Sequence, residues 1–473
     1  MTSDNSPEKQ SRSVVGGRTA LIAATVLAAV VGTTAATTME AVAAPGADRQ
    51  GGPVSTAADP ASGATAQAGS TRTGFLAKAF TLSAKPSPAA ERKRLKSVFQ
   101  LSSSQSTGLY AKASSRIAVG VDDTPDSRAG KVELRVGVPG AEGGQHIIGL
   151  KPGVNTYRVP VGGMLYLSVE GDSSSAPTTV RLGGGGVMEV PRFVLGTTGN
   201  DEFRRMLDRQ TAAPWVEYVG ERTILTVDRA TALKYRGQDQ RWLMENYETI
   251  ALAQDAVNKV GPGGRTSPSP LVQHITLDGR AKKGTARAED GHVAFGPAYA
   301  RVLLSPKKLQ FDDKAWKVWL ELGRQRQLQP VSGEGLGEAT ASLYATAVER
   351  HFDHPFRTPA PLKPSRMLAK LREANPKSVD VRRAVMLDQL RLAHGNDFWP
   401  KVNNLTLNDR PIAPRTHQDT LVVTAGVIAG ADLRDFFAKA GISVGPFGQK
   451  NLDSLDLRKP GTDPSTLGYG TPE

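Results

Sequence analysis

One stretch of the chain combines residue types that can do chemistry. A segment predicted to be helical, Trp316 to Gln327, carries Glu321 and Arg324 about one helical turn apart, and Glu338 stands near the start of the next predicted helix. A carboxylate held on a helix is a candidate general base. A guanidinium within reach of two carboxylates can instead bind both through charge-assisted, often bidentate, hydrogen bonds. The spacing therefore offers either an acid–base centre or an ion-paired cluster.

The same segment resembles the zinc helix of the enhancin-like, mucin-targeting zinc metallopeptidases, the M-sixty peptidase family. Their pattern is W-x-x-W-H-E-x-G-H-x-x-Q, then a loop, then a glutamate that opens a helix; the sequence here is WKVWLELGRQRQ, followed by GLGEATASLY at Gly335–Tyr344. Weaker matches follow the family's order roughly between Thr107 and Val444, at Ser106–Ala111, Val187–Leu195, Gly291–Tyr299, Met386–Leu390, Ala393–Phe398 and Gly430–Gly441. The resemblance implies an N-terminal β-sandwich joined to a metallopeptidase core.

The zinc motif is degenerate. In such a site two histidines at positions i and i+4 of one helix bind zinc, the glutamate after the first activates a water molecule, and the next helix supplies a third ligand. The resemblance assigns the two histidine positions to Leu320 and Arg324, the third ligand to Glu338 and the general base to Glu321. Leucine has no lone pair, and arginine stays protonated and repels a dication. We therefore expect no cofactor, although the family implies zinc, and no peptidase chemistry from Glu321.

Arg324 can replace the missing cation. It lies on the side of the helix that faces Glu338, so we hypothesise that it pairs with Glu338, with Glu321, or with both, and preserves the cleft without its chemistry. The candidates for the walls of that cleft are Trp316, Trp319, His292, Tyr299 and Tyr344. The tryptophans and Leu320 have an alternative interpretation as a packed apolar helix face.

A rewired metal site is the main rival hypothesis. His292 falls in the region that resembles the substrate-cleft strand, and His351 and His354 are three residues apart on a predicted helix. The latter pair lies at least three turns beyond Glu338, which favours a surface role.

The elements that position these residues predict an α+β fold in three parts. Residues 75–198 alternate apolar and polar residues in short runs separated by turn clusters, which predicts a β-sandwich. Residues 199–360 mix helices and strands as a metallopeptidase-like domain, and residues 361–473 form a helical C-terminal subdomain and tail. Within these parts we expect a single strand at Val187–Leu195 and another at Val302–Leu304.

The N-terminus predicts export. Residues 1–43 have a basic start, an apolar stretch and the small residues Ala41 and Ala43 at a cleavage site, as in a signal peptide; an uncleaved signal would be an anchor. Residues 44–74 are rich in Ala, Gly, Ser and Thr and predict a disordered linker. The chain has 473 residues, no cysteine and a net charge of +13, which excludes disulfides and thiolate sites and favours anionic partners.

The leading hypothesis is a secreted, monomeric, zinc-less pseudoenzyme that binds extracellular glycan, glycoprotein or cell-wall polymer. One alternative is an active secreted peptidase with relocated metal ligands; a second is a basic cell-surface adhesin. We expect no membrane span after signal removal. No nucleic-acid motif is present, since the basic residues are not interleaved with aromatic ones.

Overall fold

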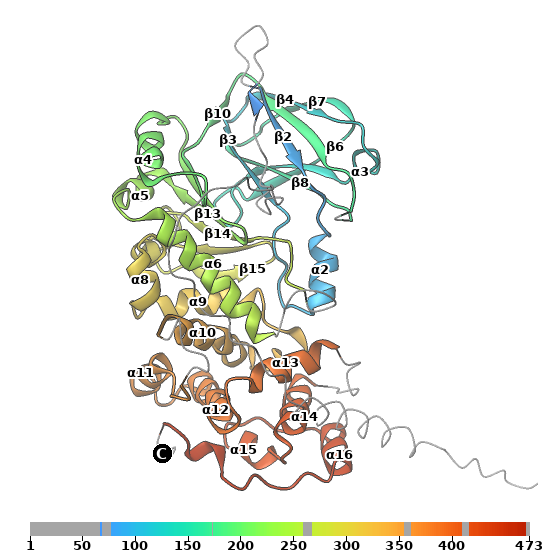
Figure 1. The fold of residues 1–473 in the computed structure, drawn as a ribbon, viewed down its shortest axis with the longest axis vertical. Helices are drawn as coiled ribbons and strands as arrows, with labels where there is room; N and C mark the ends of the chain where they lie inside the picture. The colour runs from blue at the N-terminus through green and yellow to red at the C-terminus, as the bar shows by residue number, and fades with distance from the viewer. Residues whose placement is uncertain are drawn as a thin grey trace, which may run out of the picture.

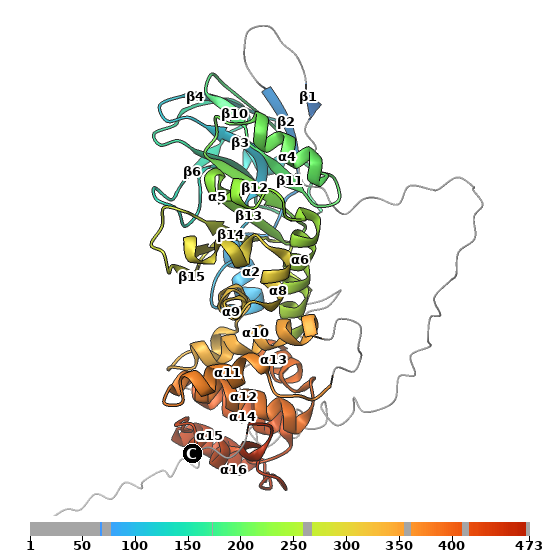
Figure 2. The same cartoon turned by 90° about the vertical axis from the view of Figure 1, so that its left-hand side faces the viewer.

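The computed structural model describes residues 67–68, 77–172, 174–258, 267–353, 361–408 and 416–469. The predicted signal peptide, most of the predicted linker and His354 lie outside them. Within the predicted linker, β1 (Gln67–Ala68) pairs with β2 (Ala77–Leu82), a pairing that composition did not suggest. Figures 1 and 2 show the sandwich at one end, a mixed layer in the middle and helices at the other end.

The N-terminal part is the expected β-sandwich. One sheet has the order β1-β2-β9-β4-β7 and the other β10-β3-β8-β5-β6. The strands beyond β1 and β2 are β3 (Gln105–Ala111), β4 (Arg116–Val121), β5 (Val132–Gly137), β6 (Gln145–Leu150), β7 (Gly153–Arg158), β8 (Gly163–Val169), β9 (Thr178–Gly183) and β10 (Val187–Glu189). Alternate residues such as Phe80, Ile117 and Leu134 are fully buried between the sheets, as the alternation predicts. Two short helices, α2 (Pro88–Leu95) and α3 (Pro125–Arg128), lie between strands.

The prediction of one strand at Val187–Leu195 is wrong. The chain leaves the sandwich after β10, and β11 (Arg192–Val194) pairs in parallel with β12 of a different sheet. The break falls at Pro191, which has no backbone N–H to donate to a ladder. Its carbonyl still accepts a bond of 3.0 Å from the backbone N–H of Glu217.

A six-stranded sheet forms the middle layer, in the order β11-β12-β13-β14-β16-β15. Its further strands are β12 (Trp215–Val219), β13 (Thr223–Asp228), β14 (Gln273–Leu277), β15 (Ala286–Glu289) and β16 (His292–Phe295). Its apolar face, with Ile275 and Phe295, packs on helices. Its polar face meets the sandwich, where Thr276 donates a bond of 2.6 Å to the carbonyl of Pro139. This alternation decides which residues of the sheet can reach the helices.

Helices cover the apolar face of that sheet. They are α4 (Asn200–Arg209), α5 (Arg229–Lys234), α6 (Gln240–Val257), α7 (Ala300–Leu303), α8 (Pro306–Phe311) and α9 (Ala315–Arg324). The strand expected at Val302–Leu304 is wrong, because these residues belong to α7 and its end. A short apolar run cannot be assigned by periodicity alone, and this one follows a helical turn at Pro297–Tyr299.

The C-terminal part is helical, as predicted. It comprises α10 (Gly337–Asp353), α11 (Arg366–Ala374), α12 (Val379–His394), α13 (Phe398–Asn408), α14 (His417–Ala429), α15 (Arg434–Ala438) and α16 (Pro446–Ser454). α10 contributes residues to the core of the middle layer and to the core of the C-terminal helices, and so joins the two parts. In the described part of the chain, no helix has both the length and the apolar character that crossing a membrane needs.

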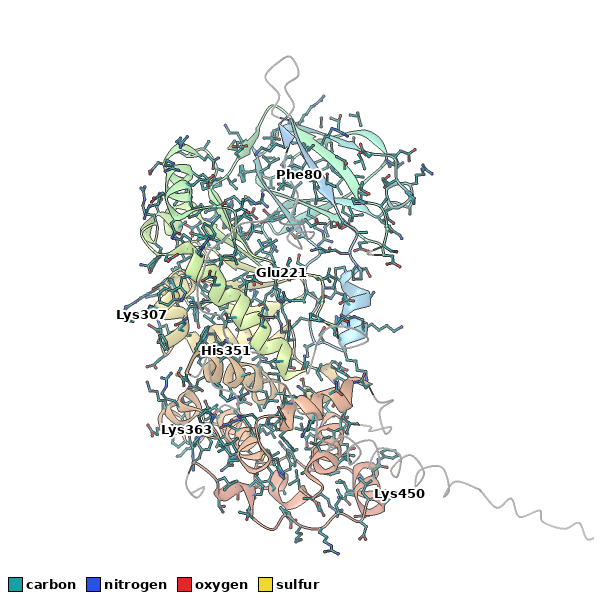
Figure 3. All side chains as sticks on the ribbon, viewed as in Figure 1. Phe80, Glu221, Lys307, His351, Lys363 and Lys450 are labelled. Atoms are coloured by element: carbon teal, nitrogen blue, oxygen red, sulfur yellow. The ribbon has the colours of Figure 1, made fainter. Side chains whose placement is uncertain are left out.

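Exposed lysines lie in more than one part of the protein. Figure 3 labels Lys307 in the middle layer and Lys363 and Lys450 in the helical part, whereas Phe80 lies within the sandwich. All three lysines are exposed. Exposed basic side chains are therefore present in both the middle layer and the helical part.

Candidate functional site

The candidate site lies where α9 meets α10. α9 buries one face, and Trp316, Trp319 and Leu320 are 5%, 1% and 2% exposed. Trp319 Nε1 also donates a bond of 3.0 Å to the carbonyl of Leu309. At Gly323 the helices approach closely, since a Cβ there would lie 2.5 Å from Cβ of Tyr344. This close approach positions the end of α9 against the first turn of α10.

Arg324 lies between two carboxylates in this contact. Its Nη2 donates to Oε2 of Glu338, and its Nε is 3.3 Å from Oε2 of Glu321. Glu321 is 3% exposed, so its charge is held away from water and depends on such partners. The hypothesised ion pair is therefore present, and it reaches both carboxylates.

Two further groups complete the centre, and the sequence analysis named neither. Lys317 Nζ lies 2.8 Å from Oε1 of Glu321 and 3.8 Å from Oε1 of Glu338. The backbone N–H of Ala288, on the edge strand β15, donates a bond of 3.0 Å to Oε2 of Glu321. Lys317 was detectable, because it precedes Glu321 by four residues and so shares its helix face. Ala288 was not, because its position depends on the register of the sheet.

The structure separates the predicted cleft residues. Tyr299 is half-buried near the centre, where burial raises the pKa of its hydroxyl, the positive charge of Lys317 lowers it and the negative charge of Glu321 raises it. Trp316 and Trp319 lie in the core, as in their alternative interpretation. Tyr344 is 1% exposed, and its hydroxyl lies 2.8 Å from two acceptors, Asn258 Oδ1 and the carbonyl oxygen of Arg326.

His292 lies on the other face of the middle sheet. The pairing of β16 with β14 puts His292 on the same face of the sheet as His274 and Thr276, which is the face toward the sandwich. The ring of His292 is accordingly close to Gly140 of the sandwich. Its Nε2 is 3.2 Å from Glu289 Oε2, and burial lowers its pKa. His292 is therefore not placed to act with Glu321.

The residues of this centre do not fit a zinc ion. Leu320 is part of an apolar core, and both carboxylates are already paired with Arg324 and Lys317. Two cations and two carboxylates balance in charge, so a dication there would meet two fixed positive charges. Across the described residues, no three His, Asp or Glu side chains come together in a way that could hold a metal.

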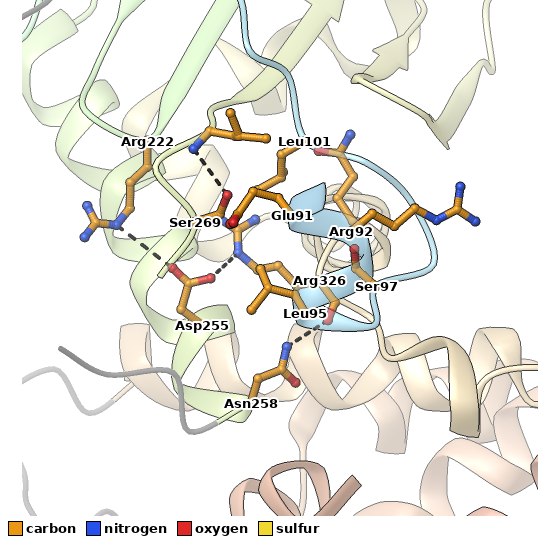
Figure 4. Close-up of a pocket in the computed structure, with 12 residues that line it drawn as sticks. Glu91, Arg92, Leu95, Ser97, Leu101, Arg222, Asp255, Asn258, Ser269 and Arg326 are labelled. Carbon is orange, nitrogen blue, oxygen red and sulfur yellow. Dashed lines mark hydrogen bonds and ion pairs between the residues drawn. The ribbon is translucent and has the colours of Figure 1, made fainter. Parts of the chain in front are cut away.

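A second polar cluster joins α2, α6 and the chain after α9 (Figure 4). Arg326 Nε is 2.6 Å from Asp255 Oδ1, and Asn258 donates a bond of 2.8 Å to the carbonyl of Arg326. The cavity beside them measures about 30 Å³. A cavity of that volume can hold a water molecule but no sugar or peptide. The cluster therefore has a structural role, in which it connects α6 to the chain after α9.

Comparison with known proteins defines the class of protein to which this fold and centre belong. The β-sandwich, the mixed sheet and the helical part together form a fold shared with solved metallopeptidases. Residues 186–441 match the family described as peptidase M60, enhancin and enhancin-like, and residues 86–182 match the N-terminal domain of M60-like peptidases. The chain belongs to this M60 peptidase family, which confirms the resemblance of its motifs. No curated protein matches the chain.

Solved structures share the fold at low sequence identity. A functionally unknown conserved protein from Bacillus anthracis is 21% identical, with a TM-score of 0.72 over 84% of this chain and 83% of that chain. The catalytic module of the metalloprotease ZmpA from Clostridium perfringens is 17% identical, with a TM-score of 0.65 over 82% and 80%. The M60 catalytic domain of ZmpC from the same organism, in complex with the sialyl T antigen, is 18% identical, with a TM-score of 0.64 over 83% and 82%. At these identities the likeness shows the fold.

Proposed function

We propose that the protein is an exported, zinc-less member of the M60 family that binds glycan, glycopeptide or cell-wall material without cleaving it. The observation that carries the proposal is the position of Arg324 between Glu321 and Glu338. These are the positions that the family resemblance assigns to the second zinc ligand, the general base and the third ligand. A guanidinium there supports an intact scaffold that has exchanged a metal for an internal ion pair.

The fold neighbours support the class of ligand. One of them, an M60 catalytic domain, was solved with the sialyl T antigen, and another metallopeptidase with the Tn antigen. The net charge of +13 adds an attraction to acidic polymers. The signal-like N-terminus supports export of the protein to the outside of the cell, where such ligands occur.

Metal analysis and a peptidase assay test the loss of chemistry. We expect purified protein to hold no stoichiometric zinc after dialysis and to leave an O-glycosylated mucin-type protein uncut. Its background should equal that of Glu321→Gln. Stoichiometric zinc that is lost on Glu338→Ala, together with cleavage, would support an active peptidase with relocated ligands and overturn the proposal.

A binding experiment tests the retained function. We expect immobilised O-glycoprotein or cell-wall polysaccharide to retain the protein, and Tyr299→Phe combined with Lys317→Met to weaken retention. Arg181→Gln is the matched control, because Arg181 is exposed on β9 of the sandwich, in a different part of the fold from the centre. Retention that salt abolishes and that the paired substitution leaves unchanged would instead support a surface adhesin.

A further inference from the structure

A separate pocket lies where the sandwich meets the middle sheet. It has a volume of about 370 Å³ and is walled by β3, β5, the loop after β5, the start of β6, the turn before β8, the start of β12 and the chain after β14. Among its lining residues are Tyr110, Glu142, His146, Gly162, Trp215 and Arg280. We refer to it as the junction pocket. None of the residues of the ion-paired centre lines it, so it is independent of that centre.

Arg280 presents free donors to the junction pocket. Its side chain is 63% exposed, and its Nε lies 3.3 Å from Asp278 Oδ1. The guanidinium carbon lies 5.4 Å from the centre of the Trp215 ring, a distance typical of a cation–π contact that holds the planar group in place. No described residue accepts a hydrogen bond from its Nη atoms. A held guanidinium with two free N–H donors side by side suits a carboxylate.

Tyr110 supplies a second positioned donor. Its hydroxyl lies above Gly162, where a Cβ would approach it to 2.4 Å, so the glycine makes room for it. Burial raises the pKa of this hydroxyl and the positive charge of Arg280 opposes the rise, and the net shift is upward. Tyr110 therefore remains a donor at neutral pH.

The remaining walls suit a polyhydroxylated ring. His146 and Glu142 are exposed at the rim and offer a ring nitrogen and a carboxylate to hydroxyl groups. Val161 is 50% exposed beside them and offers an apolar contact. Pockets that combine aromatic and apolar walls with a few convergent polar groups are typical of small-ligand sites, and this volume accommodates a sugar unit.

We infer that the junction pocket binds a carboxylated monosaccharide unit, with the carboxylate on the Nη atoms of Arg280 and hydroxyl groups on Tyr110, His146 and Glu142. Glu142 lines the pocket and Asp278 pairs with Arg280, so these two carboxylates disfavour a doubly charged phosphate more than a singly charged sugar acid. The pocket has room for a sugar ring as well as a carboxylate, so a simple carboxylate such as acetate would leave most of it unfilled.

Titration of the full protein tests the inference, with sodium glucuronate, glucose, acetate and inorganic phosphate as separate probes. Calorimetry reports binding, and so does the intrinsic tryptophan fluorescence, to which Trp215 contributes as one of five tryptophans. We expect saturable binding of glucuronate, at least about tenfold weaker binding of glucose and acetate, and a loss of about tenfold or more on Arg280→Gln. Tyr110→Phe should weaken binding less. Arg181→Gln is the control, since Arg181 is 57% exposed and, like Arg280, pairs with an aspartate.

Four outcomes would overturn the inference. They are no glucuronate binding up to about 20 mM, equal affinity for glucose, equal affinity for acetate or phosphate, and unchanged affinity in Arg280→Gln. Thermal unfolding of each variant separates lost contacts from lost folding. Because Arg280 does not touch Glu321, Arg324 or Glu338, these results stand whatever the peptidase assay shows.

Discussion

The guanidinium of Arg324 binds the carboxylate of Glu338 across the contact between α9 and α10. Its Nε also reaches Glu321, and Lys317 approaches both carboxylates. The two positive and two negative charges of this centre therefore balance, and each charged group is paired within the centre. The centre links α9, which carries the degenerate motif, to α10, which contributes residues to both cores. Its contribution to stability is the first measurable consequence.

Replacing Arg324 by methionine should destabilise the protein. Glu321 is 3% exposed and would keep one cation and one backbone donor, so part of its desolvation would no longer be compensated. We expect the free energy of unfolding in urea to fall by about 2 kcal/mol. Arg287→Met is the control, because Arg287 is 56% exposed and its surface pair with Glu289 contributes little. Equal losses in both variants would show that the centre has no special role.

Restoring the histidines should restore a metal site. In Leu320→His combined with Arg324→His, two imidazoles would share a helix face and Glu338 would be freed from its guanidinium. We expect this variant to take up about one zinc per chain and to unfold at a higher temperature with zinc than with a chelator. Arg324→His alone should not. Failure of the double variant to bind zinc would show that the scaffold no longer holds the family's ligand geometry.

Regular patterns made much of the fold predictable. Alternation predicts a strand at Arg116–Asp122, and β4 spans Arg116–Val121. Ser365 and Ser378 mark helix starts because each side chain accepts from a backbone N–H. The misassigned run at Val302–Leu304 has an apolar pattern that suits both a strand and a buried helix. Helical spacing predicted the pairing of Arg324 with Glu321, whereas the pairing with Glu338 followed from the family resemblance, which assigns Arg324 and Glu338 to zinc-ligand positions.

Contacts set by tertiary structure were not predictable in this way. The N–H of Ala288 reaches Glu321 only because β15 is the edge of its sheet. His292 was a cleft candidate because its region resembles a cleft strand, yet the strand turns its side chain to the opposite face. The junction pocket unites residues from Tyr110 to Arg280, which no local motif connects.

Stability should depend on pH through Glu248. Burial raises the pKa of this carboxyl to about 7, although the backbone N–H of Arg222 bonds to it and the positive charge of Arg222 lowers that pKa. The unfolded chain then loses this proton at lower pH than the folded protein, so the contribution of Glu248 to stability falls as pH rises from about 4.3 to 7.

Glu248→Gln removes that titration. We expect its free energy of unfolding relative to wild type to be about 1 kcal/mol or more higher at pH 8 than at pH 4.5, from urea melts at both values. Glu245→Gln on the same helix, which is exposed, is the control. A difference of the opposite sign would mean that the folded protein favours the charged form of Glu248.

Gly323→Ala tests the close contact that aligns α9 with α10. In an ordinary helix interior, replacing glycine by alanine raises the free energy of unfolding by up to about 1 kcal/mol. A decrease in the free energy of unfolding would therefore indicate a steric clash. Here the new Cβ would lie 2.5 Å from Cβ and 3.2 Å from Cγ of Tyr344, which is buried and anchored by its hydroxyl to Asn258. Tyr344 cannot yield easily, so we expect a loss of about 2 kcal/mol in urea unfolding.

The matched control for this change is Gly149→Ala on β6, where a Cβ meets no atom within 4 Å. It should leave stability within about 0.5 kcal/mol of wild type. In Gly323→Ala the helices should also separate, which lengthens the pair between Arg324 and Glu338. Glu338→Gln should therefore lower the free energy of unfolding by less in the Gly323→Ala background than in the wild type, as a double-mutant cycle would measure. Additive losses would mean that Gly323 supports packing alone and does not align the ion-paired centre.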